Sequence, residues 1–318
     1  MSRELVVAID GGGSKTDVAV VDLVTGDEVG TSRGAGCSHH QIGIDATVIV
    51  IDEAVTAALA DAGVVPADVR HVGCYLTAID LDSEQAAVHA ALSRLPWASR
   101  SLVVDNDVFA LLRAGTDAPD AAVVVCGTGI NGVAVRADGA TARVLALGQI
   151  SGDWGGASGL AEEVLWYAAR AEDGRGEPTA LRPALLSWTG RDSVHDVTLA
   201  VHTGALSVSS WLDRAAEVVE LANAGDAVAI SLVERQGTEI GLLASSLLAR
   251  LGLAGSAVPV VLGGGIGAAA DPRLVAAAAR TLAERAPLAT LSVVTAPPVT
   301  GAVRLALDSA RTRQERSA

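Results

Sequence analysis

The feature that most constrains the fold of this chain is a pattern that occurs twice, at residues 6–22 and again at residues 122–138. The first copy reads VVAIDGGGSKTDVAVVD and the second reads AVVVCGTGINGVAVRAD. Each contains an apolar segment typical of a strand, a glycine-rich turn, a second such segment and an aspartate before the next turn. Internal duplication of this kind predicts a repeated architecture. We therefore expect two α/β domains of related topology that face each other across a cleft.

The length of 318 residues agrees with two domains, because it exceeds what one core usually serves. The small polar loop Gly115–Ala121, which contains a proline, fits a domain boundary. Residues 157–251 are predicted to be mostly helical. Hydrophobic periodicity predicts strands at 5–9, 17–21, 29–33, 69–75, 101–104, 259–262 and 288–294, and helices at 45–62, 83–93 and 272–285, with two more that begin near residues 107 and 301.

Charge and composition argue against several classes of protein. The formal net charge of −14 disfavours nucleic acid or an anionic membrane as the main partner, because both select basic surfaces. No apolar run approaches the ~20 residues that a membrane helix needs, and the first residues lack the apolar core of a signal peptide, so we expect a cytoplasmic protein. The cysteines Cys37, Cys74 and Cys126 are isolated in sequence, which predicts buried reduced thiols and no disulfide framework or zinc motif.

Three glycine clusters follow apolar segments, at residues 11–13, 127–129 and 263–265. Glycine lets backbone N–H groups approach a phosphate closely, so three such turns indicate nucleotide binding. A dinucleotide-binding fingerprint needs a strand before it and a helix after it. The second turn is followed by another predicted strand, and the third lacks the acidic residue about 20 positions later that binds a ribose. The GxxxxGK[ST] phosphate loop does not occur in the sequence.

Five motifs in chain order carry a family resemblance. They are DGGGSKTD at 10–17, DND at 105–107, CGTGIN at 126–131, GDWGG at 152–156 and LGGG at 262–265. Together they resemble the N-acetylglucosamine kinases of the BadF/BadG/BcrA/BcrD ATPase family, within the actin-like ATPase and sugar kinase superfamily. The resemblance covers nearly the whole chain. It implies two RNase H-like domains that face each other across a nucleotide cleft, the first formed by residues 1–117 with a C-terminal helix at 302–318 and the second by residues 118–301.

The resemblance also implies the cofactors ATP and Mg²⁺. Asp10 would help to hold hydrated Mg²⁺, and Asp107 would be the general base that takes the proton from the attacking sugar hydroxyl. Asp105 is a second carboxylate nearby, for which we expect a capping or turn role. Lys15 is the only lysine, and it either reaches the phosphates or is a solvated turn residue. The residues implied to bind ATP are Gly11, Gly12, Gly13, Ser14, Lys15, Thr16, Gly127, Thr128, Gly129, Gly264 and Gly265.

Sugar binding is implied for a further set of residues. Ser38 or His39 stands where the family commonly has an asparagine, and Thr77 where it often has a serine. Asp153 would accept hydrogen bonds from sugar hydroxyls, and an Asx-turn is the alternative. The full set implied to contact the sugar is Ser38, His39, Thr77, Asp107, Asn131 and Asp153.

Two further positions have alternative interpretations. Trp154 either stacks on a face of the sugar or fills its own loop. The pair His39 and His40 is not expected to bind a metal ion, because no third ligand is visible near it in the sequence.

We therefore expect an ATP-dependent kinase that phosphorylates the 6-hydroxyl of N-acetylglucosamine, and the resemblance implies a homodimer. The alternatives are a kinase for another amino sugar, such as glucosamine or a muramic-type sugar, and a non-kinase ATPase of the same family. An ATP-driven electron-transfer activator would need clustered thiolates for an iron–sulfur cluster, which three scattered cysteines do not supply. A sugar-sensing repressor would carry a DNA-binding helix-turn-helix, for which we expect no room before the first strand.

Overall fold

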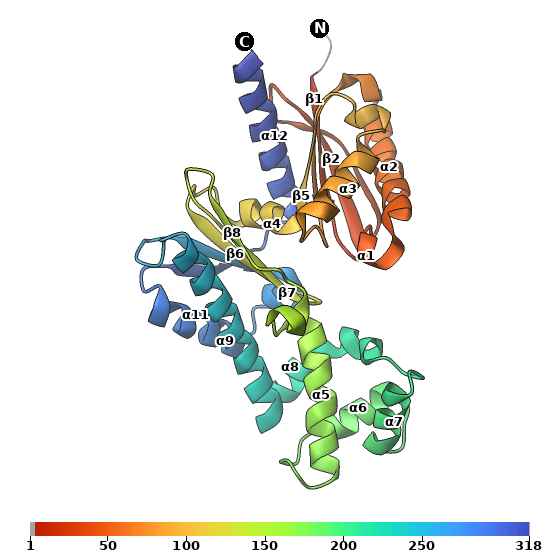
Figure 1. Ribbon diagram of the computed structural model, residues 1–318, viewed down its shortest axis with the longest axis vertical. Helices are drawn as coiled ribbons and strands as arrows, with labels where there is room; N and C mark the ends of the chain where they lie inside the picture. Colours follow the sequence, from red (N-terminus) through yellow and green to blue (C-terminus); the bar gives the residue numbers. More distant parts are fainter. Residues whose placement is uncertain (1–3, 318) are drawn as a thin grey trace. The chain divides into compact units, whose positions relative to one another are not determined.

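The computed structural model describes residues 4–317 and divides the chain into two compact units (Figure 1). The first contains the residues up to Asp117 and those from Val294 onward, and the second contains Ala118–Val293. The second unit thus ends at Val293 and not at the expected residue 301. The reason is that helix α12 (Pro298–Ser317) begins earlier than expected and packs on the sheet of the first unit.

The first unit is built on a five-stranded mixed sheet with the strand order β3-β2-β1-β4-β5. Strand β1 pairs antiparallel with β2 and parallel with β4, and β4 pairs parallel with β5. The strands are β1 (Leu5–Gly11), β2 (Lys15–Asp22), β3 (Glu28–Ala35), β4 (Val69–Leu76) and β5 (Leu102–Asn106). The other helices are α1 (His39–Ile42), α2 (Ile44–Asp61), α3 (Asp82–Leu92) and α4 (Asp107–Gly115), with the 3₁₀ turns η1 (Pro66–Asp68) and η2 (Pro96–Ala98).

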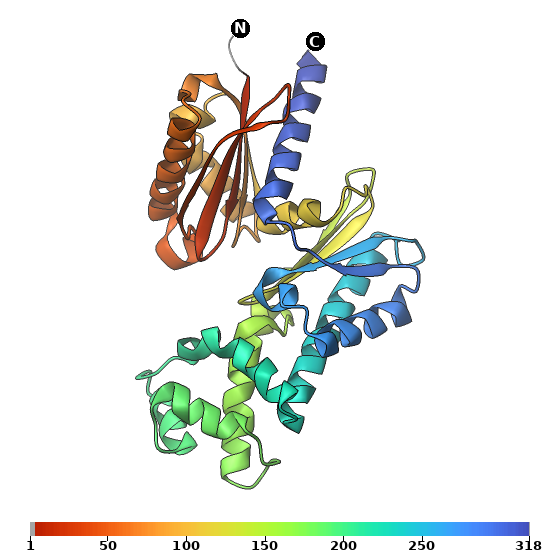
Figure 2. The same ribbon diagram turned by 180° about the vertical axis from the view of Figure 1, so that it is seen from behind.

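Alternate residues of β1 belong to opposite layers of the first unit. Leu5, Val7 and Ile9 belong to an apolar cluster that includes buried residues of α2 and α3. Val6 and Ala8 belong to a second cluster that includes residues of α4 and α12. A strand buried on both faces reads as a continuous apolar run, which explains why residues 5–9 carry no polar side chain. Both ribbon views show α12 on one face of this sheet and α2 on the other (Figures 1 and 2).

The second unit repeats this sheet and adds more helices. Its strand order is β10-β9-β6-β7-β8, in which β6 pairs antiparallel with β7 and parallel with β9. The strands are β6 (Ala121–Cys126), β7 (Ile130–Val135), β8 (Thr141–Arg143), β9 (Pro259–Gly263) and β10 (Thr290–Val293). The helices are α5 (Gly156–Glu172), α6 (Leu181–Thr189), α7 (Val194–His202), α8 (Ala215–Asn223), α9 (Ala227–Arg250), α10 (Gly264–Ala268) and α11 (Pro272–Arg285), with the 3₁₀ turns η3 (Gly148–Ser151) and η4 (Val208–Arg214).

The two sheets have the same topology, so the predicted fold class is confirmed. Strands β6 to β10 of the second sheet take, one by one, the places of β1 to β5 in the first, with the same parallel and antiparallel pairings. The duplicated sequence pattern corresponds to the hairpins β1–β2 and β6–β7, which lie at the same position in each sheet.

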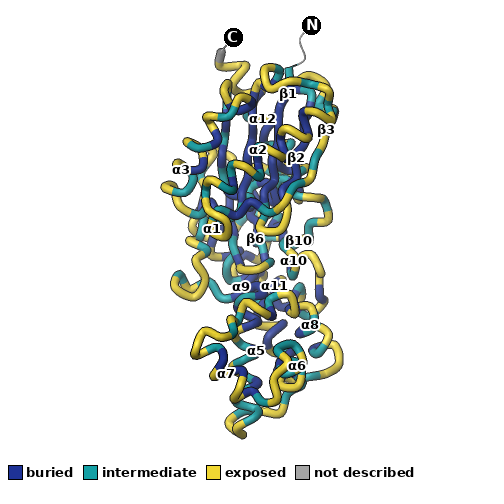
Figure 3. Tube along the Cα trace, turned by 90° about the vertical axis from the view of Figure 1, so that its right-hand side faces the viewer, coloured by how far each residue is buried: buried dark blue, intermediate teal, exposed yellow. Residues whose placement is uncertain are grey.

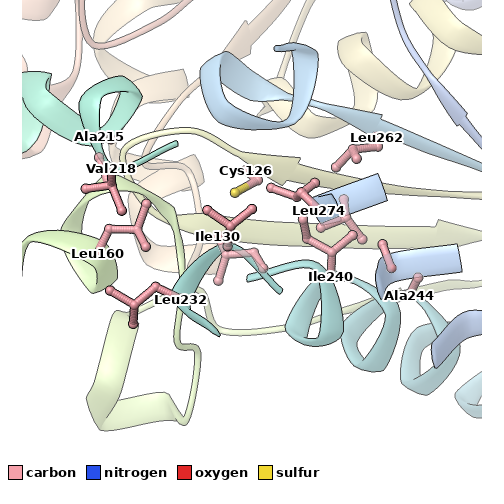
Figure 4. Packing of buried hydrophobic residues seen from close by; sticks show 14 of the residues in the cluster. Cys126, Ile130, Leu160, Ala215, Val218, Leu232, Ile240, Ala244, Leu262 and Leu274 are labelled. Atoms are coloured by element: carbon pink, nitrogen blue, oxygen red, sulfur yellow. The ribbon is translucent and has the colours of Figure 1, made fainter. Parts of the chain in front are cut away.

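One large apolar cluster forms the core of the second unit. Figure 4 shows Cys126 of β6 and Ile130 of β7 in the same cluster as Leu160 of α5, Ile240 of α9 and Leu274 of α11. Figure 3 colours the chain by burial and shows that the strands are buried and that the outer sides of the helices are exposed. Among residues 4–317, none of the helices is both long and apolar enough to cross a membrane.

Candidate active site

The candidate residues of the first unit lie where its parallel strands end. Strands β1, β4 and β5 run in the same direction, so their carboxyl ends meet at one edge of the sheet. Asp10 lies next to the end of β1, Thr77 follows β4, and Asp107 follows β5 as the first residue of α4. The Thr77 N–H donates a hydrogen bond to the carbonyl of Gly11 at 2.8 Å. The structure therefore brings these three predicted residues to the same edge as the first glycine turn.

The β1–β2 turn is held in place by the loop that follows β3. The N–H of Cys37 donates to the carbonyl of Gly12 at 3.0 Å. A Cβ on Gly36 would lie 2.1 Å from the carbonyl oxygen of Gly13, so only glycine allows this approach. Gly13, Ser14 and Lys15 are exposed at the tip of the turn, where a phosphate can reach them.

Lys15 and its two neighbours in β2 have different surroundings. Thr16, which the resemblance implied to bind ATP, is fully buried, and its hydroxyl donates to the carbonyl of Ala35 at 2.7 Å. Lys15 Nζ lies 2.8 Å from Asp17 Oδ2, and Arg33 Nε lies 2.5 Å from Asp17 Oδ1. Burial acts to raise the pKa of Asp17, but the hydrogen bonds from Arg33 and Lys15 outweigh it and hold that pKa below its usual value. Asp17 therefore anchors the only lysine beside the turn.

Two predicted carboxyl groups have raised pKa values. Burial, then the charge of Asp17, raise the pKa of Asp10 from 3.8 to about 6, and Lys15 partly offsets this. Burial, then the charges of Asp10 and Asp80, raise the pKa of Asp107 from 3.8 to about 7. Like charges brought together in a partly dry site disfavour ionisation in this way. Asp10, Asp80 and Asp107 thus form a cluster of carboxyl groups that a cation would stabilise.

Asn106 links this cluster to the start of α4. Its side-chain oxygen accepts from the N–H of Val108 at 3.0 Å, and its amide donates to the carbonyl of Ile79 at 3.0 Å and to Asp80 Oδ1 at 2.9 Å. The N-cap of α4 is therefore Asn106 and not Asp105, which corrects the capping role expected for Asp105. Neither Asn106 nor Asp80 was among the residues predicted for the site.

Asp105 lies on the same face of the sheet as Asp10, because Asp10 is in register with Tyr75 and Tyr75 is in register with Asp105. It lies in β5 between Val104 and Asn106, both of which are buried, and strand alternation places it on the opposite face of the sheet from Val104. Burial, then the charge of Asp105, raise the pKa of Tyr75, a residue of the apolar cluster under α12. Asp107 lies close enough to Asp10 for the charge of Asp10 to raise its pKa.

The loop that follows β4 contains a strained residue. Ala78 has a φ of 65°, in the left-handed region that a residue with a side chain seldom adopts. It lies between Thr77 and the segment Ile79–Asp80, which Asn106 holds by two hydrogen bonds. Strain of this kind persists where surrounding contacts determine the backbone, and it is found often at functional sites.

The loop predicted to contact the sugar lies beside helix α3. Ser38 is buried and precedes α1, and His39 is largely buried while His40 is half exposed. Glu84 of α3 approaches both histidines, with its Oε1 atom 2.7 Å from His40 Nε2 and 3.9 Å from His39 Nε2. The pair therefore has a third potential ligand, which the sequence analysis did not identify. Glu84 is 44 residues away from His40 in sequence, so only the fold brings it there.

In the second unit, the β6–β7 turn packs on the start of α5. The N–H of Ala157 donates to the carbonyl of Gly127 at 2.9 Å, and the N–H of Ser158 donates to the carbonyl of Thr128 at 2.8 Å. The turn is a hairpin between antiparallel strands, so it is not a dinucleotide-binding fingerprint. A Cβ on Gly129 would meet nothing within 4 Å, which leaves that side of the turn open to a ligand.

The third glycine cluster meets the second one. Gly264 has a φ of 83°, and a Cβ there would lie 2.5 Å from the carbonyl oxygen of Cys126. Position 264 therefore requires glycine for two reasons, the positive φ of the backbone and the close approach of the Cys126 carbonyl oxygen. A Cβ on Gly127 would lie 3.8 Å from the N atom of Gly265, and a Cβ on Gly265 would meet open space. The second unit thus presents two adjoining glycine-lined backbone segments.

Asn131 and Asp153 both lie in the second unit and are both partly buried. Asn131 follows the turn in β7, and its side-chain oxygen accepts from the N–H of Gly132 at 2.7 Å. Asp153 follows η3, and its Oδ2 atom accepts from the hydroxyl of Ser151 at 2.5 Å. The side chain of Asp153 thus bonds to Ser151, two residues before it, whereas an Asx-turn has a bond to a following backbone N–H.

The ring of Trp154 contacts the side chain of Arg235. The guanidinium carbon of Arg235 lies 3.9 Å from the centre of a Trp154 ring, which is a cation–π contact. Arg235 in turn forms an ion pair with Glu163 of α5 at 2.7 Å. Trp154 therefore packs within the second unit, as the loop-filling alternative requires.

Comparisons with known proteins place these features in a family. The model of the BadF/BadG/BcrA/BcrD ATPase family matches residues 7–305. A curated relative, the N-acetyl-D-glucosamine kinase of Dictyostelium discoideum, is 24% identical over 319 residues, which cover 97% of this chain and 99% of that protein.

Solved structures share the fold at lower identity. A proposed N-acetylglucosamine kinase from Chromobacterium violaceum matches with a TM-score of 0.76 and 22% identity, over 96% of this chain and 100% of that chain. One from Porphyromonas gingivalis matches with a TM-score of 0.69 and 19% identity, over 95% of this chain and 99% of that chain. A ROK hexokinase from Thermus thermophilus matches with a TM-score of 0.59 and 18% identity, over 97% and 99%. These likenesses show a two-domain actin-like sugar kinase fold.

Proposed function

The chain belongs to the BadF/BadG/BcrA/BcrD ATPase family, and from that premise we propose that it is an ATP-dependent sugar kinase. The proposed reaction transfers the γ-phosphate of ATP to the 6-hydroxyl of N-acetylglucosamine. The observation that carries the proposal is the position of Asp107, which follows β5 at the same edge of the first sheet as Asp10 and the first glycine turn. Burial and the charges of Asp10 and Asp80 raise its pKa to about 7. A general base works best when its pKa lies near the working pH.

Asp107 is the proposed base, and the chemistry can be followed atom by atom. As the 6-hydroxyl oxygen forms its bond to the γ-phosphorus, the bond from that phosphorus to the β–γ bridging oxygen breaks, and ADP leaves. The hydroxyl proton passes to the carboxylate of Asp107. The amide of Asn106 binds Asp80 and its oxygen caps α4, so the backbone beside Asp107 is fixed before substrate binds. General base catalysis contributes typically 10²–10⁴-fold, and positioning supplies much of the rest.

ATP is proposed to bind through glycine-lined backbone in both units. In the first unit, the exposed turn of Gly12, Gly13 and Ser14 carries Lys15 beside it, oriented by Asp17. In the second unit, the turn of Gly127, Thr128 and Gly129 and the adjoining Gly264–Gly265 segment are the proposed contacts. Backbone N–H groups in such turns bind phosphate oxygens without a Cβ in the way. Thr16, being buried, is proposed to support the turn from within, next to Gly11.

The carboxyl groups of the first unit fit a hydrated Mg²⁺ ion. Asp10 is buried with a raised pKa, and Mg²⁺ prefers carboxylate and water oxygens. Asp10 is the proposed residue to hold it. When bound, the ion supplies positive charge against the phosphates and the carboxylates. The preference for N-acetylglucosamine is supported by the named relative, and Ser38, His39, Thr77, Asn131 and Asp153 are the proposed sugar contacts.

Location and assembly are also part of the proposal. All three cysteines are free and buried, which suits a reducing compartment such as the cytoplasm. The homodimer implied by the family resemblance would be tested by light scattering of the purified protein.

The test is ADP release with Mg-ATP against a panel of sugars: N-acetylglucosamine, glucosamine, N-acetylmannosamine, N-acetylmuramic acid and glucose. We expect strong, selective turnover with N-acetylglucosamine, and a loss of at least 100-fold in kcat for Asp107→Asn. The matched control is Asp27→Asn, an exposed carboxylate in the β2–β3 turn of the same unit, which should leave kcat unchanged. Selective turnover of another amino sugar would correct the substrate. Sugar-independent hydrolysis would overturn the kinase proposal. Near-normal turnover by Asp107→Asn would overturn the assignment of Asp107 as the base.

A further inference from the structure

His39, His40 and Glu84 converge from two helices that the sequence keeps apart. Each of the three side chains offers one ligand atom, and these three atoms all lie within 4.8 Å of one another. The two histidine rings are 4.4 Å apart between centroids and tilted by 60°, so they are not stacked face to face. Of the groups of three or more histidine, cysteine, aspartate and glutamate side chains within residues 4–317, this is the one whose ligand atoms lie close enough for a metal ion.

The carboxylate of Glu84 is oriented before any ion arrives. Its Oε2 atom accepts hydrogen bonds from the backbone N–H groups of Asp80 and Leu81, both at 2.9 Å. The Oε1 atom is the one that faces the histidines. Hydrogen bonds to the second oxygen of a ligating carboxylate fix its direction, and such outer contacts strengthen metal sites.

The separations fit a small four-coordinate ion. With bonds of 2.0–2.1 Å to nitrogen and oxygen, two ligands of a tetrahedral Zn²⁺ ion lie about 3.3 Å apart. The distances from Glu84 Oε1 to the two Nε2 atoms, 2.7 Å and 3.9 Å, lie on either side of that value. Small side-chain rotations would therefore equalise them.

We propose that His39, His40 and Glu84 form a binding site for a divalent transition-metal ion of the Zn²⁺ class, with a fourth position open to water. Two imidazoles and one carboxylate suit such ions and do not suit Mg²⁺, which binds oxygen donors. The site is distinct from the Asp10 carboxylate cluster. Its bound ion would join the start of α1 to the start of α3 and so hold the Ser38–His40 loop against Asp80.

The test uses the full-length protein, stripped of metal by a chelator and titrated with Zn²⁺ against a chromophoric chelator. We expect one Zn²⁺ per chain, and with Co²⁺ the intense visible absorption of a four-coordinate site. His40→Ala and Glu84→Gln should each weaken Zn²⁺ binding at least tenfold. Circular dichroism checks that each variant is folded, and two independent variants keep the test valid should one of them unfold.

The control is His202→Ala, which removes an exposed histidine of α7 in the other unit and should leave Zn²⁺ affinity unchanged. Millimolar Mg²⁺ should not displace the bound ion. The proposal would be overturned by no stoichiometric binding, or by equal affinity in wild type, His40→Ala and Glu84→Gln. Because the readout is metal binding and not turnover, this failure would leave the kinase proposal standing.

Discussion

Replacing Asp107 with asparagine should make the first unit more stable while it abolishes the proposed catalysis. The carboxyl group has a pKa raised from 3.8 to about 7, so its ionised form is disfavoured in the folded protein. At 1.36 kcal/mol per pKa unit, full ionisation costs about 4 kcal/mol of folding free energy. Asparagine has nearly the same shape and no charge, so Asp107→Asn removes this cost.

The sign of the pH dependence is opposite to that of a salt-bridged aspartate. Between 3.8 and about 7 the folded state binds a proton that the unfolded state has released, so wild-type stability falls as the pH rises through this range. At pH 8.5 the full cost applies, about 4 kcal/mol. At pH 5 the folded carboxyl is still protonated and the cost is only about 1.6 kcal/mol. The gain from Asp107→Asn should therefore shrink by roughly 2–3 kcal/mol between pH 8.5 and pH 5.

The assay must report the first unit alone, because two compact units can unfold separately. Hydrogen exchange followed by mass spectrometry, measured in increasing urea on peptides from β1 and α4, gives that local stability. Asp27→Asn is the matched control and should change it by less than about 0.5 kcal/mol at either pH. If Asp107→Asn failed to stabilise these peptides at pH 8.5, or if its gain did not fall at pH 5, the carboxyl group would not lie in the repulsive, partly dry site described above.

Three more outcomes are expected from the same site. In wild type, log(kcat/KM) should rise with pH and level off near pH 7 as Asp107 ionises; a flat profile between pH 5.5 and 8.5 would contradict its role as base. Asn106→Ala removes a buried cap and two further hydrogen bonds, and should lower the urea stability of the first unit by about 2–4 kcal/mol; a loss below 0.5 kcal/mol would refute that account. Gly36→Ala forces a Cβ against Gly13 and should raise the KM for ATP at least tenfold, whereas Gly255→Ala, where a Cβ meets open space, should not.

The architecture was predictable because its signal is local and repeated. An apolar strand, a glycine turn and a second strand recur in the same order, and the two sheets have the same topology. The helix expected at 272–285 forms with those bounds, because Asp271 caps it and Pro272 begins it. Helix α1 was not predicted, because its four residues are too few to show any periodicity.

The site was predictable only where a motif holds the residues together in sequence. Asp10 and Asp107 were predicted from their motifs. Asp80, beside Asn106, and Glu84, beside His40, were not predicted, because contacts between distant segments place them there. Asp105 and Asn106 are both good capping residues by type. The end of β5 decides which of them caps α4, since Asn106 is the last residue of the strand and is buried on the same face as Val104. The sequence alone does not show where that strand ends.

The placement of α12 has a consequence for how the protein is made. The sheet face formed by Val6, Ala8 and Ala19 is covered by α12, whose Gly301 allows close approach to Ala110 of α4. That helix is translated long after the face that it covers. At 5–20 residues per second, a ribosome needs roughly 15–55 s to add the residues between the two. Throughout this interval the nascent first unit carries an apolar face without its cover, while the second unit can already fold as a continuous segment. Loss of α12, through a nonsense codon or a proteolytic cut, would therefore expose a face of the first unit that was synthesised long before the helix.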